Sequence, residues 1–284
     1  PTAGIDSLFA CPGAETVEDL QACIICENQA GAAQLFTQQN GASFQAIVSE
    51  SSSPIQSFVD QAAPGDTLLI LPGTYEQSVT IDVDGLQLIG CGAANNERPV
   101  LTPPATNPSP NGIFASGTDG LVFQSLELLA WAENGIRVNQ ANGVTFRDVI
   151  GDGGENQSSV YAIYPGESSV VLVEGCVARN ISDAGIYVGQ DTGLVVRYNT
   201  AEFNVAGIEI ENSEFGKVYG NYATNNTGGL LVFKLPGPPL QVSNDHEVFD
   251  NVLVDNNTPN FGQAGTSVAV IPDGTGLLVL SNDT

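Results

Sequence analysis

Ser182 to Phe233 reads SDAGIYVGQDTGLVVRYNTAEFNVAGIEIENSEFGKVYGNYATNNTGGLLVF, and this stretch decides the fold. It repeats one short phrase, in which a glycine is followed by two apolar residues separated by one variable residue. The copies are Gly185-Ile186-Tyr187-Val188, Gly207-Ile208-Glu209-Ile210 and Gly229-Leu230-Leu231-Val232. Successive copies lie 22 residues apart, from Ile186 to Ile208 and from Ile208 to Leu230. A constant period of this length is typical of a solenoid.

Each period has room for two β-type segments. Ile, Val and Leu alternate with other residues in runs of only four or five before Gly or Asn turns the chain. The i, i+3, i+4 apolar stripe of a helical repeat is absent. Coils of such strands, stacked about 4.8 Å apart, pair every strand with its equivalents above and below and bury the apolar columns as one core. The sequence therefore predicts an all-β parallel β-helix solenoid.

The repeat also predicts a register. One inward column should contain Ile136, Ile163, Ile186, Ile208, Leu230 and Val268. A second should contain Phe123, Phe146, Val173, Val196, Val218 and Val248. A ladder at one turn should contain Asn199, Asn221 and Asn251, because Asn tolerates left-handed backbone and can pass amide hydrogen bonds between coils. An outward column alternates in charge and is predicted to be structural, with members Gln124, Arg147, Glu174, Arg197 and Tyr219.

Composition and charge restrict the partners. The chain has 284 residues, with 32 acidic and 7 basic side chains and a net charge of −25. Such a charge repels nucleic acid, anionic membrane surfaces and polyanionic glycans. The sequence contains no run of 18 apolar residues, so no membrane span is predicted. The chain lacks methionine and begins at Pro1, which indicates a processed product, with a removed signal peptide as the obvious explanation.

The cysteines and the segment before the repeats complete the organisation. Cys11, Cys23 and Cys26 crowd near the N-terminus, and we expect one disulfide among them in an oxidising compartment. Cys176 falls in a core column and should be a buried thiol.

We divide the chain into a Cys-containing extension, residues 1–53, and a β-helix, residues 54–284. Residues 54–62 have helical spacing and should cap the first coil.

At this point a resemblance is specific. Ile55 to Gly90, IQSFVDQAAPGDTLLILPGTYEQSVTIDVDGLQLIG, resembles the cap and first coil of right-handed parallel β-helix proteins of the pectate-lyase-like superfamily. Ser182 to Phe233 resembles bacterial exported proteins known as parallel β-helix domain-containing proteins. The resemblance covers residues 54–284. It implies a right-handed solenoid with a short N-terminal capping helix, located outside the cell, at its surface or in the periplasm.

The superfamily includes polysaccharide lyases, glycoside hydrolases, epimerases and noncatalytic proteins, and fold does not choose among them. The Asn-Thr-Asp and Gly-His-Gly segments of polygalacturonases do not occur here, and neither does the Asp-Pro-His segment of alginate epimerases. Lyases need basic groups to abstract a proton and to neutralise the uronate, and seven Lys and Arg residues supply few. The missing signatures favour a noncatalytic role.

One outward strip carries the candidate site. Arg137, Tyr164, Tyr187 and Glu209 should stand on successive coils, with Lys234 at one flank. Aromatic faces beside hydrogen-bonding groups suit a neutral sugar chain. The alternative is that the two tyrosines only stack as solvent-facing ladder residues. Glu209 and Glu211 are weaker candidates for an acid–base pair or for Ca²⁺ ligands.

Three classes of function follow. The leading hypothesis is an exported, noncatalytic protein that binds glycan or builds a surface structure, with no required cofactor. The first alternative is a polysaccharide-active enzyme of lyase, hydrolase or epimerase type that uses the outward strip. The second alternative is a subunit of a larger extracellular assembly with other protein partners.

Overall fold

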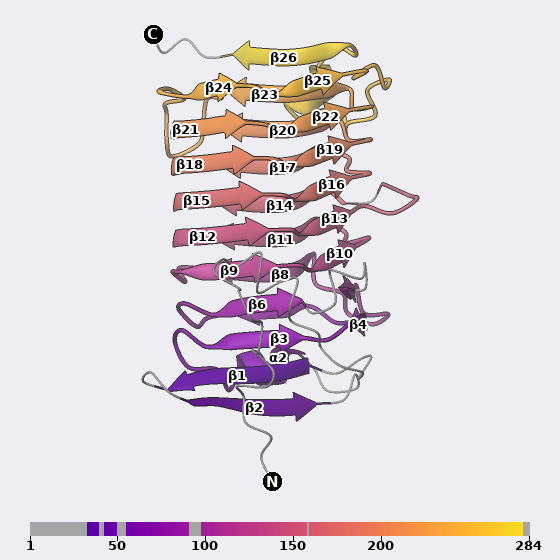
Figure 1. Cartoon of the computed structure of the whole chain (residues 1–284). Helices are drawn as coiled ribbons and strands as arrows, with labels where there is room; N and C mark the ends of the chain where they lie inside the picture. The colour runs from indigo at the N-terminus through magenta and orange to yellow at the C-terminus, as the bar shows by residue number, and fades with distance from the viewer. Residues whose placement is uncertain (1–32, 40–42, 50–54, 91–97, 158, 281–284) are drawn as a thin grey trace.

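The computed structural model describes residues 33–39, 43–49, 55–90, 98–157 and 159–280. Within these ranges the chain winds into a solenoid in which each full coil contributes one strand to each of three sheets. Figure 1 shows the coils stacked in sequence order between the two termini. The predicted parallel β-helix is confirmed. The prediction of two strands in each coil is wrong, because a third strand of only three residues follows the Asn turn.

The strands of each sheet follow the order in which the coils stack. Sheet A comprises β2 (Ser43–Ser49), β1 (Ala33–Gln39), β3 (Thr67–Ile70), β6 (Gln87–Gly90), β9 (Leu121–Gln124), β12 (Asn142–Arg147), β15 (Ser169–Glu174), β18 (Thr192–Arg197), β21 (Glu214–Tyr219) and β24 (Glu247–Phe249). Sheet B comprises β4 (Gly73–Glu76), β7 (Pro99–Thr102), β10 (Glu127–Leu129), β13 (Ile150–Asp152), β16 (Val177–Arg179), β19 (Thr200–Glu202), β22 (Tyr222–Thr224) and β25 (Val252–Val254). Sheet C comprises β5 (Val79–Ile81), β8 (Asn111–Ser116), β11 (Asn134–Asn139), β14 (Tyr161–Gly166), β17 (Ala184–Gly189), β20 (Ala206–Glu211), β23 (Gly228–Phe233) and β26 (Thr275–Leu280).

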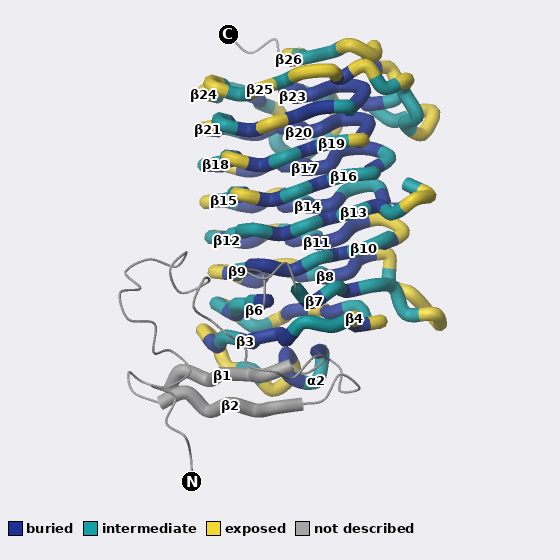
Figure 2. Tube along the Cα trace, turned by 45° about the vertical axis from the view of Figure 1, so that its right-hand side comes forward, coloured by how far each residue is buried: buried dark blue, intermediate teal, exposed yellow. Residues whose placement is uncertain are grey.

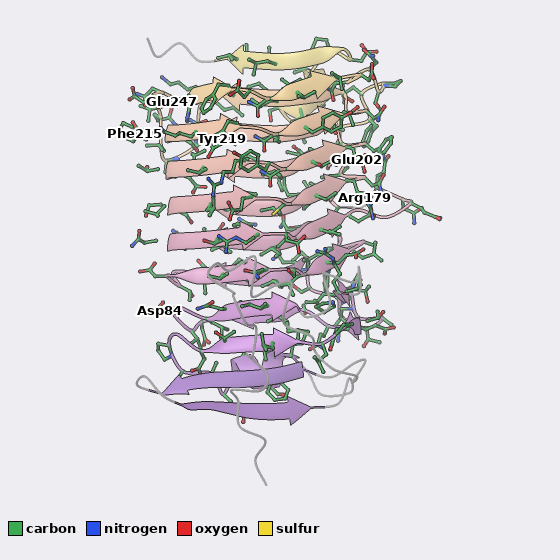
Figure 3. The ribbon with its side chains drawn as sticks, viewed as in Figure 1. Asp84, Arg179, Glu202, Phe215, Tyr219 and Glu247 are labelled. Carbon is green, nitrogen blue, oxygen red and sulfur yellow. The ribbon has the colours of Figure 1, made fainter. Side chains whose placement is uncertain are left out.

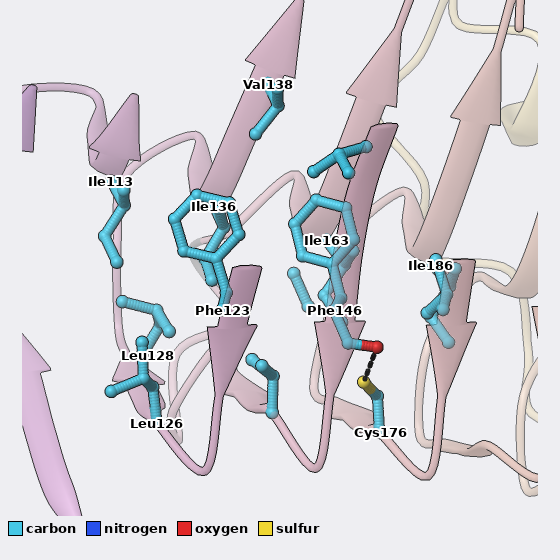
Figure 4. Close-up of a cluster of buried hydrophobic side chains, with 14 of the residues drawn as sticks. Ile113, Phe123, Leu126, Leu128, Ile136, Val138, Phe146, Ile163, Cys176 and Ile186 are labelled. Atoms are coloured by element: carbon cyan, nitrogen blue, oxygen red, sulfur yellow. Dashed lines mark hydrogen bonds between the residues drawn. The ribbon is translucent and has the colours of Figure 1, made fainter. Parts of the chain in front are cut away.

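The core consists of the inward columns that the repeat predicts. Ile136, Ile163 and Ile186 pair in register on neighbouring strands of sheet C and are fully buried (Figure 4). The rings of Phe123 and Phe146 stack with centroids 5.4 Å apart. Burying one such side chain contributes roughly 1.5 to 3 kcal/mol. A core that runs the length of the solenoid therefore supplies the main stabilising term.

One end of the first inward column is corrected. Leu230 pairs with Leu277 on β26, whereas the sequence predicted Val268 at this position. Val268 instead begins a 3₁₀ turn, η3 (Val268–Val270), inside the long connection between β25 and β26. Because that connection leaves the solenoid and returns, counting periods along the sequence selects the wrong residue.

Cys176 is a buried free thiol, as predicted. Its sulfur lies 3.5 Å from the carbonyl oxygen of Phe146. Burial raises the pKa of the thiol to about 12. The predicted disulfide among Cys11, Cys23 and Cys26 lies outside the described residues.

The Asn ladder is confirmed, and a second ladder accompanies it. The Oδ1 atom of Asn221 accepts hydrogen bonds from the backbone and side-chain amides of Asn199, at 3.1 and 2.9 Å. Asn251 accepts the equivalent pair of bonds from Asn221. The same arrangement recurs at the next turn, between sheets B and C, in a ladder of three residues: Asn204, Asn226 and Asn256. The two ladders satisfy backbone groups that the turns would otherwise leave buried without partners.

The two ends of the described chain differ. At the N-terminal end, α2 (Ile55–Val59) buries Ile55, Phe58 and Val59 against the core, which confirms the capping helix. The hairpin of β1 and β2 extends sheet A beyond β3 in antiparallel orientation. At the C-terminal end, the inward residues Leu277 and Val279 of β26 are 49% and 56% exposed. The assembly hypothesis stays a prediction.

We predict that Asn221→Ala lowers the free energy of unfolding by about 3 kcal/mol, because it leaves the Asn199 amide and the Val196 carbonyl buried without their partners. Urea denaturation measures this change. The control is Asn257→Ala, whose side chain is exposed and which should change stability by less than about 0.5 kcal/mol. Equal effects of the two substitutions would show that the ladder is not stabilising.

Candidate functional site

The candidate site lies on the outer face of sheet C, where the register brings the predicted strip together. Arg137 pairs with Tyr164, and Tyr187 pairs with Glu209. The guanidinium carbon of Arg137 lies 4.7 Å from the centre of the Tyr164 ring. Lys234 follows β23, two coils beyond Tyr187, and its backbone N–H donates to Leu280.

Three tyrosines form the centre of the site. Tyr164 and Tyr187 have ring centroids 4.6 Å apart, and Tyr161 lies 5.0 and 4.9 Å from them. Two glycines allow the rings to lie down on the sheet. A Cβ atom at Gly166 would come within 2.8 Å of the Tyr164 ring, and one at Gly189 would collide with the Tyr187 hydroxyl. The Tyr-x-Gly spacing on β14 and β17 therefore fixes where these rings lie.

Three carboxyl groups adjoin the tyrosines. The Tyr161 hydroxyl donates to Asp183, and the Tyr187 hydroxyl donates to Glu211. Glu209 interacts electrostatically with both other carboxyl groups and is 1% exposed. Its Oε2 atom is buried and has no hydrogen-bond partner among the residues that the structure describes. None of the ion pairs among the described residues involves Asp183, Glu209 or Glu211. We call these six residues the tyrosine–carboxyl cluster.

The cluster shifts the pKa values of its acids upward. Burial, together with the charges of Asp183 and Glu211, raises the pKa of Glu209 well above its usual range. Burial and the charge of Glu211 raise the pKa of Asp183 to about 7, against the opposing hydrogen bond from Tyr161. Burial also raises the pKa of Glu211, while the hydrogen bond from Tyr187 lowers it. At neutral pH Asp183 is therefore only partly ionised.

The expectation of a solvent-facing strip is wrong for its C-terminal half. Tyr187 is 5% exposed, and every residue of β17, β20 and β23 is buried (Figure 2). The connection from β25 to β26 covers this face, because its Val268 and Ile271 pack against the outward Leu231. Arg137, Tyr161 and Tyr164 stay partly exposed. The cluster thus opens to solvent on the side of β11 and β14.

Sequence reasoning missed Tyr161 and Asp183. Tyr161 is the first residue of β14, and Asp183 lies at the bend just before β17, so both lie outside the alternating residues that the repeat defines. The register of the repeat could have located both residues. Tyr161 pairs with Ala184, and Asp183 directly precedes Ala184, so Asp183 lies beside the strand that carries Tyr161. Within the described ranges, no group of three or more His, Cys, Asp or Glu side chains is placed to hold a metal ion. Ca²⁺ at Glu209 and Glu211 therefore stays a prediction.

Comparison with known proteins agrees with the architecture. Residues 105–282 match the family described as the right handed beta helix region. The chain belongs to this family. No curated protein matches the sequence. In the described part of this β-helix protein, no helix has the length and apolar character needed to cross a membrane.

Several solved structures are similar in fold. An alginate lyase from Paenibacillus sp. str. FPU-7 is 16% identical, with 80% of this chain and 95% of that chain covered and a TM-score of 0.47. The periplasmic alginate epimerase AlgG is 11% identical, with coverage of 83% and 84% and a TM-score of 0.40. A DFA-IIIase mutant from Arthrobacter chlorophenolicus A6 is 12% identical, with coverage of 62% and 63% and a TM-score of 0.38. At this level of identity the similarity concerns the fold alone.

We predict that Glu209→Gln stabilises the protein at pH 8 by on the order of 2 kcal/mol and has little effect at pH 4. A group whose pKa is raised in the folded state contributes its full stability below its unfolded pKa, near 4. That contribution is lost as the pH rises through the folded pKa, which for Glu209 lies well above the usual range. Gln is neutral throughout and avoids this loss. Thermal unfolding across the pH range measures the difference.

The matched control is Glu202→Gln, which changes a partly exposed carboxylate on sheet B. Its effect on stability should be small at both pH values. If Glu209→Gln destabilises the protein equally at pH 4 and pH 8, the ionised form of Glu209 is not unfavourable in the folded chain.

Proposed function

We propose that this protein is an exported enzyme that hydrolyses glycosidic bonds in a neutral polysaccharide, with the tyrosine–carboxyl cluster as its active site. This proposal favours the hypothesis of a polysaccharide-active enzyme over the hypothesis of a noncatalytic protein. The observation that carries it is the gathering of Asp183, Glu209 and Glu211 in a buried environment with no cationic partner among the described residues.

Such a cluster is unfavourable for stability. Burial disfavours each charged form, and the like charges disfavour one another. Apolar side chains at these positions would make the folded state more stable. The next coil has such a side chain, Leu231, at the position of Glu209. Perturbed carboxyl groups beside partly exposed aromatic rings are instead typical of acid–base catalysis.

The three carboxyl groups suit different roles. Asp183, with a pKa of about 7, is suited to be the general acid: its proton passes to the glycosidic oxygen as the bond from that oxygen to the anomeric carbon breaks. Glu211 receives a hydrogen bond from Tyr187, which favours its ionised form, so it is suited to take the proton of the attacking water. Glu209 is fully buried, and the charges of Asp183 and Glu211 raise its own pKa, so it is given no part in the proton transfers.

The substrate follows from the groups around the opening. Tyr164 offers an aromatic ring, and Arg137 and Asn139 offer hydrogen-bonding groups, on the side where the cluster meets solvent. These features suit the faces and hydroxyl groups of sugar rings. A net charge of −25 disfavours a polyanionic chain, so we infer a neutral polysaccharide.

We predict that Glu211→Gln and Asp183→Asn each lower the release of reducing ends from a cleaved neutral polysaccharide by at least about 100-fold, as expected for loss of a general acid or base. A reducing-sugar assay over a panel of glucans, mannans, xylans and fructans measures this. Glu202→Gln should keep full activity, and thermal unfolding should show that all three variants fold. Retention of a polysaccharide without any release of reducing ends would support the noncatalytic hypothesis.

We predict further that kcat/KM of the wild type falls as the pH rises above about 7, because Asp183 then loses the proton that it must deliver. The residual activity of Asp183→Asn should lack this decline. An unchanged alkaline decline in Asp183→Asn would assign it to a different group.

A further inference from the structure

A second unusual surface lies on the outer face of sheet A, on a different sheet from the tyrosine–carboxyl cluster. Tyr198, which follows β18, is 61% exposed and has a φ angle of 57°. Left-handed backbone is uncommon for a bulky residue and has a conformational cost. An exposed side chain in this conformation contributes little to the core, so packing does not account for it.

The neighbouring coils show what this turn ordinarily accepts. Gly175 on the preceding coil and Gly220 on the following coil have φ angles of 62° and 66°. Asp148 and Asp250 take the same conformation further along the stack. Tyr198 is therefore a single aromatic residue with a glycine on either side. The space beside Gly175 is largely open, whereas the space over Gly220 is taken by the Tyr198 ring itself.

The ring of Tyr198 lies down on the surface. A Cβ atom at Gly220 would be only 2.6 Å from two of its ring carbons. Tyr219, on the outer face of β21 (Figure 3), is edge-on to Tyr198 with an interplanar angle of 82° and centroids 5.6 Å apart. Tyr219 in turn stacks on Phe249, with an interplanar angle of 7°. Tyr219 is thus held by its partners, whereas Tyr198 is 61% exposed and available for contact.

Polar groups border this ring in a fixed arrangement. Glu174 accepts hydrogen bonds from Arg147 at 2.5 Å and from Arg197 at 2.5 and 2.8 Å, which confirms the predicted charge ladder. Arg197 also donates to the Tyr219 hydroxyl at 3.0 Å, and its guanidinium carbon lies 5.8 Å from the Tyr198 ring centre. Because Glu174 is shared between two arginines, the guanidinium groups are oriented before any ligand arrives.

We propose that Tyr198, Arg197 and Tyr219 form a second, noncatalytic glycan-binding platform. A sugar ring stacks on the exposed side chain of Tyr198, and its hydroxyl groups accept hydrogen bonds from Arg197 and meet the Tyr219 hydroxyl. The ligand is a neutral polysaccharide, because Glu174 balances part of the positive charge and the whole chain carries −25. Binding here does not depend on catalysis at the tyrosine–carboxyl cluster.

The test is affinity electrophoresis of the full chain in gels that contain hydroxyethyl cellulose, galactomannan, xylan or inulin, with polygalacturonate as the acidic comparison. We expect at least one neutral polymer to retard the wild type. Tyr198→Ala should weaken that retardation at least 10-fold, and Tyr198→Trp should preserve it. Arg197→Gln should weaken it to a smaller extent.

The matched control is Phe203→Ala. Phe203 is also an exposed aromatic residue in left-handed conformation, with a φ angle of 59°, but it lies one turn further along the same coil, after β19. Its removal should leave retardation unchanged. Thermal unfolding should show that Tyr198→Ala and Phe203→Ala are both as stable as the wild type.

Four outcomes would overturn the proposal. They are no retardation by any neutral polymer, equal retardation of wild type and Tyr198→Ala, equal loss in Phe203→Ala, and a change of sedimentation coefficient in Tyr198→Ala, which would assign the surface to self-association. The hydrolysis of short oligosaccharides should be unchanged in Tyr198→Ala. Failure of binding here and failure of catalysis at the cluster are therefore separate results.

Discussion

The in-register pairing of each coil with the next is the constraint on which the other features of this protein depend. Because equivalent residues stack one coil above another, a residue type that suits one coil must suit its neighbours, and a slip of one residue would turn the core outward. The isoleucines of sheet C, the Asn ladders and the shared Glu174 all follow from this condition. Extra residues are accommodated only at turns, as between β25 and β26, where strand pairing is undisturbed.

The same pairing explains how an unfavourable cluster can persist. Asp183, Glu209 and Glu211 belong to strands, or to the turns leading into them, that are hydrogen-bonded on both sides. These strands cannot move apart without breaking the hydrogen bonds between coils. The free energy needed to bury the carboxyl groups therefore lowers the stability of the whole fold. The apolar columns and the two Asn ladders offset that cost. A rigid solenoid can therefore hold acidic side chains in an environment that raises their pKa values, and functional sites commonly show such perturbation.

The period made most of the fold predictable, because it is a local property of the sequence. It placed Ile186 over Ile208 and Arg147 beside Glu174 without knowledge of any long-range contact. It failed where the chain leaves the period. Val268 was assigned to the first inward column because counting cannot follow the connection before β26. The same connection packs in one buried cluster with Tyr187. Tyr161 was missed because it precedes the phrase that defines the register.

Glycine residues next to Tyr187 and Tyr198 determine how these two rings lie on the solenoid. Gly189 lets Tyr187 fold onto its own strand, where its hydroxyl reaches Glu211 and a covering loop excludes water. Gly220 lets Tyr198 lie on the following coil, where no described segment covers it and the side chain stays exposed. In a stack of near-identical coils, a missing side chain is the simplest way to make room for a ring. Where an aromatic residue adjoins a glycine in the next column or coil, the ring lies flat, and the loops then determine whether it is buried or presented to solvent.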